Sequence, residues 1–379
     1  MKMRPPAEPG MRLADVDTPA LIIDLDAFER NLTHMADLTK QYGIRVRPHA
    51  KTHKSPFIAH KQIARGAVGV CCQKVSEAEV MVRGGIKDVL ITNEIAGRRK
   101  LERLAWLAHE AQIAACTDSL ENVRDLDAAA SHAGVTLDVL VEIDCGGRRC
   151  GVAPGRPAAE IAGAIAGSEH LSFAGLQAYY GAAQHFRTET ERTGAIASAG
   201  ERVQDTLAEL QKRDLTCRII GGAGTGTFEH EATSGIWNEL QPGSYIFMDA
   251  DYARNQKSDG SRFDKFEHAL FVLATVMSAP APERAVLDAG HKALSNDSGF
   301  PEVPGLPGAK YHRPSDEHGV LDLSESERRL QVGDMVLLIP GHCDPTVNLH
   351  DWYVCIRGLQ TPEPHVEAVW PVAARGAIF

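Results

Sequence analysis

The chain has 379 residues, which is long for one compact domain, so a barrel of about 250 residues with a smaller second domain fits its length. Apolar residues make up 44% of the chain and charged residues 24%, which is typical of a globular protein with a large core and excludes extensive disorder. The 40 Lys and Arg residues against 50 Asp and Glu residues give a net charge of −10 without a long basic run, so nucleic-acid and anionic-membrane partners are disfavoured.

The segment MKMRPPAEPGMRLADVDTP at the start of the chain lacks the apolar core of a signal peptide. No other stretch approaches the roughly 18 apolar residues of a membrane span. We therefore predict a cytoplasmic protein. Its 8 cysteines are scattered along the chain and form no pair of CxxC motifs, so we expect reduced thiols.

Residues 26–264 alternate apolar runs of strand length with segments of helix length, which is the pattern of repeated βαβ units. The predicted helices are Asp26–Tyr42, Ser76–Gly84, Ala96–Ala111, Glu121–His132, Ala158–Ala166 and Thr188–Lys212. The predicted strands are Ile44–Arg47, Ala67–Cys71, Asp88–Thr92, Ile113–Cys116, Leu137–Ile143, Phe173–Tyr179, Cys217–Ile220 and Ser244–Asp249. Eight parallel strands joined by helices predict an α/β fold, a TIM-like (β/α)8 barrel.

Beyond residue 264 the alternation stops and short segments rich in Val, Leu and turn residues follow. Strands are predicted at Ala269–Val276, Arg284–Asp288, Met335–Ile339, Trp352–Arg357 and His365–Pro371. The early apolar run Ala20–Asp24 has no helix before it, so we expect it to join these strands. The predicted organisation is a barrel over 26–264 and an all-β domain made of 1–25 and 265–379.

The segment RPHAKTHK places Lys51 where the first barrel strand gives way to a loop. A lysine amine can form a Schiff base with an aldehyde cofactor when burial or neighbouring cations lower its pKa. Arg47, His49, His53 and Lys54 are such neighbours in sequence. The alternative is an ordinary solvated lysine at the end of a strand.

Reactive groups of a parallel barrel collect at the carboxyl ends of its strands. Polar residues follow the predicted strands there, namely Gln73, Asp144, Arg149, Tyr179, Gln184 and His185. The glycine-rich loop GGAGTGT follows the seventh strand and contains Gly222, Gly224, Thr225 and Gly226, whose backbone N–H groups could cradle a phosphate. Without the lysine, a tight turn alone would be the favoured interpretation of this loop, but a phosphate cradle together with Lys51 predicts a site for pyridoxal 5'-phosphate.

Two further candidates depend on histidines. His185 lies in a polar loop at the predicted active face, where a neutral imidazole could accept a proton near pH 7. The segment PGHCDPT places His342 and Asp344 two residues apart in a predicted turn, where they could share one divalent ion with water. The alternatives are a solvated His185 and a structural histidine beside a turn aspartate.

A resemblance to a known family is carried by segments that follow one another in the same order along almost the whole chain. They are DTPALIIDLDAFERN, RPHAKTHK, GVCCQKVSEAE, TNEIAG, VEIDCGGRRCGV, FAGLQAYYGAAQH, GGAGTGT, ELQPGSYIFMDADY, SDEHGV and PGHCDPTVNLHDWYV. In these segments the sequence resembles the D-threonine aldolase family. This family belongs to the fold-type III, alanine racemase-like pyridoxal-phosphate enzymes, which also include D-3-hydroxyaspartate aldolase and eukaryotic-type D-serine dehydratase.

The resemblance implies a homodimer in which the C-terminal β domain closes over the cofactor. It also implies roles for single residues, as follows: Lys51 as the Schiff-base lysine, Tyr179 at the pyridine nitrogen, Arg149 near the phenolic oxygen of the ring, the GGAGTG loop at the phosphate, His185 as the base, and His342 with Asp344 as ligands of manganese or magnesium. Relatives often have GGGTG in the phosphate loop, and we expect the extra alanine to be tolerated if its amide still points inward.

The proposed metal ligands, His342 and Asp344, distinguish aldolase from dehydratase activity within this group of enzymes. The dehydratases typically bind zinc with a His-x-Cys pair, whereas Asp344 is a hard oxygen ligand that favours Mn²⁺ or Mg²⁺ over Zn²⁺. A small-molecule D-β-hydroxy-amino acid is thus the expected substrate and aldol cleavage the expected reaction, with D-serine dehydratase, alanine racemase and a non-catalytic cofactor carrier as less favoured alternatives. The extra carboxylate of D-3-hydroxyaspartate could be received by His312, Arg313 or His318 if they reach the pocket.

Overall fold

The structure is a computed structural model that describes residues 4–379. One of its two main sheets is parallel, and its strands neighbour each other in the order β2 (Arg45–Val46), β9 (Glu239–Leu240), β8 (Ile219–Gly222), β7 (Leu171–Gln177), β6 (Leu137–Glu142), β5 (Gln112–Thr117), β4 (Asp88–Glu94) and β3 (Val70–Cys72). Just beyond β2, the Ala50 N–H donates to the Cys71 carbonyl at 2.8 Å, and His49 forms a parallel β-bridge with Cys71. These contacts join the first and last strands of the sheet and close it. The predicted barrel is therefore confirmed.

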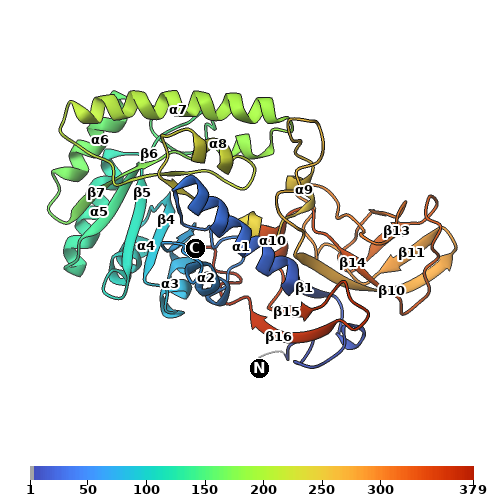
Figure 1. Ribbon diagram of the computed structural model, residues 1–379. Coiled ribbons are helices and arrows are strands. Elements are labelled where there is room, and N and C mark those ends of the chain that lie inside the picture. Colours follow the sequence, from blue (N-terminus) through green and yellow to red (C-terminus); the bar gives the residue numbers. More distant parts are fainter. Residues whose placement is uncertain (1–3) are drawn as a thin grey trace.

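Helices cover the outside of this barrel (Figure 1). They are α1 (Leu25–Tyr42), α2 (Pro56–Ile63), α3 (Val75–Arg83), α4 (Arg98–Leu107), α5 (Leu120–Ala133), α6 (Arg156–Ala166), α7 (Glu189–Gln211) and α8 (Phe228–Thr233). The first begins at Asp24, whose carboxylate accepts the N–H groups of Asp26 and Ala27, and ends at Gly43, which has φ +64°. Capping and a left-handed terminal glycine are the usual signals for helix ends, and they explain why this helix was predictable.

The predicted eighth strand, Ser244–Asp249, is wrong. The eighth strand is β9, and residues Ser244–Ile246 form a 3₁₀ helix instead. Pro242 and Gly243 end the extended chain after β9, because proline has no N–H to donate to a neighbouring strand. The apolar residues Ile246 and Phe247 are fully buried. The apolar run therefore reflects burial in the core and does not indicate a strand.

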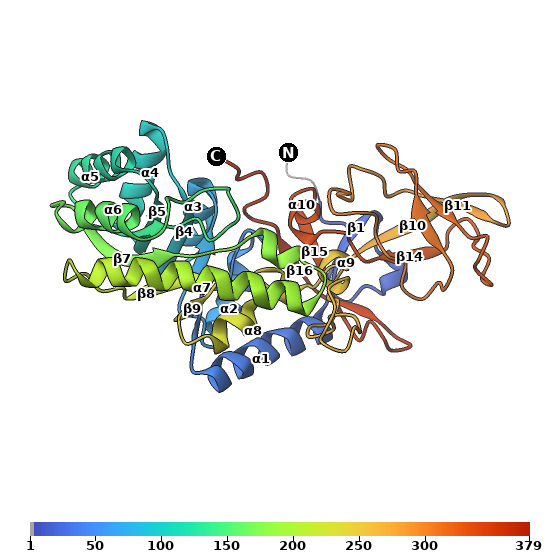
Figure 2. The same cartoon turned by 90° about the horizontal axis from the view of Figure 1, so that it is seen from above.

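The second sheet has the order β12 (Lys310–His312), β13 (Gly319–Asp322), β11 (Arg284–Leu287), β10 (Leu270–Ala281), β1 (Ala20–Asp24), β15 (Trp352–Arg357) and β16 (His365–Pro371), and β14 (Met335–Leu338) also pairs with β10. The early strand β1 lies between β10 and β15, as expected for a segment that joins the later strands. Short β12 and β13 were not predicted. Figure 2 shows the barrel with α7 at one end of the molecule and β10 with β11 at the other.

Helix α1 packs the two parts together. The Phe28 ring is fully buried, 6.4 Å from the ring of Phe247 and 6.0 Å from that of Trp370 in β16. Burying such a side chain stabilises the fold by about 2 kcal/mol. Arg357 in β15 adds ion pairs to Asp26 and Glu29 of α1. These contacts fix the mouth of the barrel against the second sheet.

All 8 cysteines are free thiols, which agrees with the prediction. Over residues 4–379, no helix combines the length and the apolar character that crossing a bilayer requires.

Candidate active site

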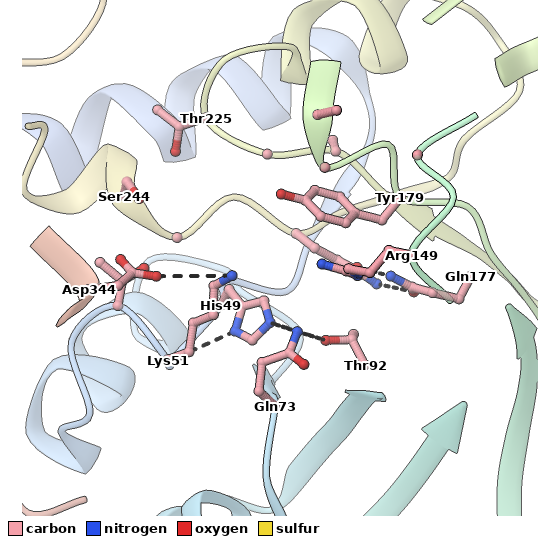
Figure 3. Close-up of a pocket in the computed structure, with 18 of the residues that line it drawn as sticks. His49, Lys51, Gln73, Thr92, Arg149, Gln177, Tyr179, Thr225, Ser244 and Asp344 are labelled. Atoms are coloured by element: carbon pink, nitrogen blue, oxygen red, sulfur yellow. Dashed lines mark hydrogen bonds and ion pairs between the residues drawn. The ribbon is translucent and has the colours of Figure 1, made fainter. Parts of the chain in front are cut away.

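A cavity of about 310 Å³ opens at the carboxyl ends of the barrel strands (Figure 3). Its wall also includes the start of α10 (Cys343–Val347), which comes from the C-terminal part of the chain. Most predicted site residues line it together: Lys51, Gln73, Arg149, Tyr179, His185, Gly224, Thr225, His342 and Asp344. The structure therefore brings the lysine, the glycine-rich loop and the histidine–aspartate pair into one space.

Lys51 projects into this cavity from the loop after β2 (Figure 3). Its Nζ lies 4.0 Å from Asp344 Oδ2, and its side chain is 35% exposed. Its backbone N–H donates to His49 Nδ1 at 3.4 Å. The amine is thus within reach of a small molecule and next to the residue predicted to bind a metal ion.

The cations near Lys51 in sequence are compensated in space. Arg47 forms an ion pair with Glu239 at 2.7 Å, deep in the barrel. Lys54 forms a buried ion pair with Glu77 at 2.5 Å. These two residues do not form the cluster of unpaired cations that the sequence suggested around Lys51.

The two histidines of the same segment are held neutral. Burial, and to a smaller extent the positive charge of the nearby Lys51, keeps the pKa of His49 well below its ordinary value. Burial also lowers the pKa of His53 to about 4. His49 Nε2 lies 3.1 Å from Thr92 Oγ1 and 3.1 Å from Gln73 Nε2, so a neutral polar layer forms the floor beside Lys51.

The glycine-rich loop after β8 presents unpaired donors to the cavity. Thr225 is buried, and its hydroxyl has no hydrogen-bond partner among the described residues. The backbone N–H groups of Gly224 and Thr225 likewise have no acceptor within residues 4–379. A Cβ at Gly224 would lie 2.6 Å from Gln184 Oε1, so a larger residue would displace the Gln184 side chain and its hydrogen bonds to Gly226 and Thr227. An anion with several oxygens would satisfy these donors.

Gly222 and Gly226 are absent from the lining of the cavity over the described residues. A Cβ at Gly222 would meet the Ala178 carbonyl oxygen at 2.4 Å, and one at Gly226 would meet the Gln184 carbonyl oxygen at 2.4 Å. The Gly226 N–H already donates to Gln184 Oε1 at 3.1 Å. These glycines lie behind the loop, where they allow it to pack against the chain after β7.

Tyr179 and Arg149 lie together in the wall of the cavity, and Tyr179 follows β7, the strand next to β8. The Arg149 Cζ atom is 5.4 Å from the centre of the Tyr179 ring, and Arg149 Nη2 is 3.8 Å from Glu142 Oε1. Burial and the neighbouring Glu94 raise the pKa of Glu142 to about 8. A carboxyl group with a raised pKa compensates the guanidinium charge of Arg149 less than an ordinary glutamate would.

His185 is held by Asp251, which the sequence analysis did not identify. His185 Nδ1 lies 2.6 Å from Asp251 Oδ2, and Arg187 pairs with the other carboxylate oxygen. Burial alone would raise the pKa of Asp251, but hydrogen bonds from His185 and Arg187 outweigh it and lower this pKa to about 2. An ionised Asp251 can only accept, so Nδ1 carries a proton, and in the neutral tautomer Nε2 is the nitrogen with the lone pair. No sequence spacing links these residues.

His342 and Asp344 lie at the start of α10, and not in the simple turn that the sequence predicted. Asp344 Oδ1 is buried without a partner among the described residues. His342 Nδ1 lies 2.8 Å from Asp297 Oδ2, which orients the ring and leaves Nε2 as a ligand atom. No three His, Cys, Asp or Glu side chains in residues 4–379 gather into a metal-binding group, so an ion here would have two protein ligands and would keep water.

The basic residues considered for an extra substrate carboxylate lie elsewhere. His312 ends β12, and Arg313 and His318 lie in the loop between β12 and β13. None of the three lines the cavity of this chain.

Comparison with known proteins identifies the family. The family described as "Alanine racemase, N-terminal domain" matches residues 23–251, and the "Putative serine dehydratase domain" matches residues 269–356. The 3-hydroxy-D-aspartate aldolase of Paracoccus denitrificans (strain Pd 1222) is 48% identical over 98% of this chain and 95% of its own length. The D-threonine aldolase of an Arthrobacter species is 44% identical over 98% of this chain and 96% of its own length.

The crystal structure of D-threonine aldolase from Filomicrobium marinum has 54% sequence identity to this chain, covers 100% of both chains and superposes with a TM-score of 0.95. Matches of this extent include the barrel, the second sheet and the cavity between them. The chain therefore belongs to the D-threonine aldolase and 3-hydroxy-D-aspartate aldolase family of alanine racemase-like, pyridoxal-phosphate-dependent lyases.

Proposed function

We propose that the chain is a pyridoxal-phosphate- and divalent-metal-dependent aldolase that cleaves D-β-hydroxy-α-amino acids, with D-threonine giving glycine and acetaldehyde. One observation carries this proposal: Lys51 and the His342–Asp344 pair face each other in the cavity that also contains the unpaired donors of the glycine-rich loop. An amine, an anion cradle and a hard metal ligand are the groups that such a reaction requires.

The residues of the cavity fit the cofactor. Lys51 would hold its aldehyde carbon, and the N–H groups of Gly224 and Thr225 with the Thr225 hydroxyl would hold its phosphate. Tyr179 and Arg149 would face the ring, with Gln73 on the floor below. Gly222 and Gly226 would contribute through the shape of the loop. Pyridoxal phosphate, when bound, supplies a ring that withdraws electrons from the bond to be cleaved.

His185 would remove the proton of the β-hydroxyl group of the substrate. Its Nε2 is the free ring nitrogen, because Nδ1 is bound to Asp251. Asp251 would stabilise the imidazolium that forms when His185 takes up this proton, and Arg187 keeps Asp251 ionised. We therefore assign His185 as the base and Asp251 as the residue that positions it.

His342 and Asp344 would hold Mn²⁺ or Mg²⁺ in preference to Zn²⁺. Asp344 supplies a carboxylate oxygen, which suits hard cations better than the thiolate of a His-x-Cys pair does. Such an ion, when bound, supplies a Lewis acid for the β-hydroxyl group. The orphaned Asp344 Oδ1 and the ring orientation set by Asp297 support this site.

A second substrate is favoured by the 48% identity to a 3-hydroxy-D-aspartate aldolase. With D-3-hydroxyaspartate the products would be glycine and glyoxylate. From the family resemblance we further propose a cytoplasmic homodimer. The mass of the purified protein in solution, measured by light scattering, tests the dimer.

The deciding experiment measures the products formed from D-threonine, D-phenylserine, D-3-hydroxyaspartate and D-serine. We expect glycine and an aldehyde from at least one β-hydroxy substrate, and turnover on D-threonine against D-3-hydroxyaspartate ranks the two candidates. Formation of pyruvate and ammonia from D-serine, without glycine from any substrate, would make the chain a dehydratase and refute the proposal.

Replacing His185 by Asn should lower turnover by about 100-fold or more and leave cofactor affinity within about threefold, because a general base contributes about that much. Asp251→Asn should also lower turnover, by roughly 10-fold, with KM little changed, and Asp251→Glu should recover part of the loss. The control is Asp264→Asn, whose exposed carboxylate pairs with Lys257 away from the site. Unchanged turnover in His185→Asn would end its assignment as the base.

A further inference from the structure

We propose that the buried ion pair of Lys54 and Glu77 is a positioning element that sets the pose of Lys51 for the cofactor. This inference rests on the proposed function, because it takes Lys51 as the cofactor lysine. Lys54 lies in the same loop as Lys51 but points away from the cavity into the protein, where its side chain is 8% exposed and that of Glu77 is 3% exposed. Neither side chain lines the cavity over the described residues.

Glu77 joins two walls of the cavity. One carboxylate oxygen lies 2.5 Å from Lys54 Nζ, and the other accepts the backbone N–H of Gln73 at 2.9 Å. Lys54 belongs to the loop after β2, and Gln73 to the turn after β3. A single carboxylate therefore fixes the loop of Lys51 against the floor residue Gln73.

The backbone of Lys54 needs such support. It has φ +50°, a left-handed conformation that a residue with a side chain rarely adopts and that persists only where surrounding contacts hold it. The Lys54 N–H donates to the Ala50 carbonyl at 2.7 Å. This backbone bond closes the turn from Ala50 to Lys54, which contains Lys51, and the contacts of the Lys54 side chain fix the end of that turn.

The C-terminal part of the chain holds the same turn from the other side. Tyr353 in β15 donates its hydroxyl to the His53 carbonyl at 2.6 Å, and Ala374 donates its N–H to the Lys54 carbonyl at 2.9 Å. Lys54 Nζ also donates to the Ala377 carbonyl at 3.4 Å. In Figure 2 the C-terminus lies beside α3, the helix that carries Glu77. Lys54 is thus the point where barrel, second sheet and C-terminal segment meet behind Lys51.

The test is a double-substitution cycle of Lys54→Met, Glu77→Gln and both together in the full-length protein. Each single variant leaves one buried charge without its partner, whereas the double variant removes both charges and also the bond between the two walls. The measured quantities are the dissociation constant of pyridoxal phosphate, the visible spectrum of the bound cofactor and the melting temperature of the cofactor-free protein. The control is Glu79→Gln, which breaks the ion pair of α3 with Arg103 on its other side.

We expect cofactor affinity to fall about 10-fold in all three variants, because a displacement near 1 Å of a reacting group has effects of this size or larger. The melting temperature should fall in the single variants and recover in the double variant, while Glu79→Gln keeps the affinity of the parent. If the double variant regains cofactor affinity along with its melting temperature, the pair has only a structural role and the proposal is overturned. Should the charge variants not fold, Tyr353→Phe loosens the same turn, and an unchanged affinity there overturns it equally.

Borohydride reduction of the parent protein with bound cofactor separates this inference from the proposed function. Reduction fixes the cofactor on its lysine, and peptide mapping should find the label on Lys51. A label on Lys54 overturns the inference, because Lys54 would then be the cofactor lysine itself. The absence of label from every lysine overturns the proposed function.

Discussion

Lys51→Ala should yield a folded, colourless protein without aldolase activity. The variant loses the only amine that lines the cavity over the described residues, so under the proposed role of Lys51 the cofactor would lose its covalent bond to the protein and the yellow absorbance that this bond produces. Turnover should drop by at least about 1,000-fold, since covalent attachment and positioning of the cofactor are both lost. Visible absorbance after reconstitution, together with turnover on D-threonine, measures both effects.

The control for this substitution is Lys74→Ala. Lys74 is exposed and follows Gln73 at the mouth of the barrel, so its loss removes the same charge from the same region without touching the cavity. The control should remain yellow and active. If the Lys51 variant remains yellow and active as well, the assignment of the cofactor lysine is wrong, and with it the arrangement proposed for the rest of the site.

Chelation with EDTA should remove activity and leave the cofactor bound. The ion is expected on His342 and Asp344, neither of which is among the residues proposed to hold the cofactor, so the cofactor contacts should not depend on it. Turnover should fall by about 100-fold or more, because the ion would supply several kcal/mol of charge stabilisation at the β-hydroxyl. Manganese should restore activity better than zinc, since a carboxylate and an imidazole with water suit it.

Asp344→Asn tests the same site without a chelator. Its turnover should be low and should respond to manganese only at much higher concentrations than the parent requires. Asp37→Asn, an exposed substitution on α1, serves as the matched loss of one carboxylate. Full activity after exhaustive dialysis against EDTA would remove His342 and Asp344 from the mechanism.

The parts of this fold that sequence could predict are those whose signals are local and repeated. The helix expected at Asp26–Tyr42 is α1, Leu25–Tyr42, because an apolar period of three to four residues and a terminal glycine lie within the segment itself. Ser244–Asp249 was mistaken for a strand because buried residues in a 3₁₀ helix and in a short strand have the same composition. Two-residue β9 has too few residues for any period to show.

In the candidate site, too, residues with a local sequence signal could be predicted, and residues that depend on contacts between separate segments could not. Lys51, His185 and Asp344 could be selected because they follow apolar runs and match family segments. Asp251, Glu77 and Glu142 could not, since their importance comes from side chains on other segments of the chain that fold beside them, such as Glu94 beside Glu142. The effect of Arg47 and Lys54 on Lys51 was misjudged for the same reason, because their carboxylate partners are far away in sequence.

The contribution of α10 to the cavity has a consequence for synthesis of the protein on the ribosome. The loop of Lys51 is synthesised early in the barrel, whereas His342 and Asp344, and Tyr353 behind the lysine, are added only after the last barrel strand. A nascent barrel would therefore carry the Lys51 amine before the residues proposed to bind the metal ion have been made. Under the proposed roles, turnover would begin only after α10 has been synthesised and packed against the barrel.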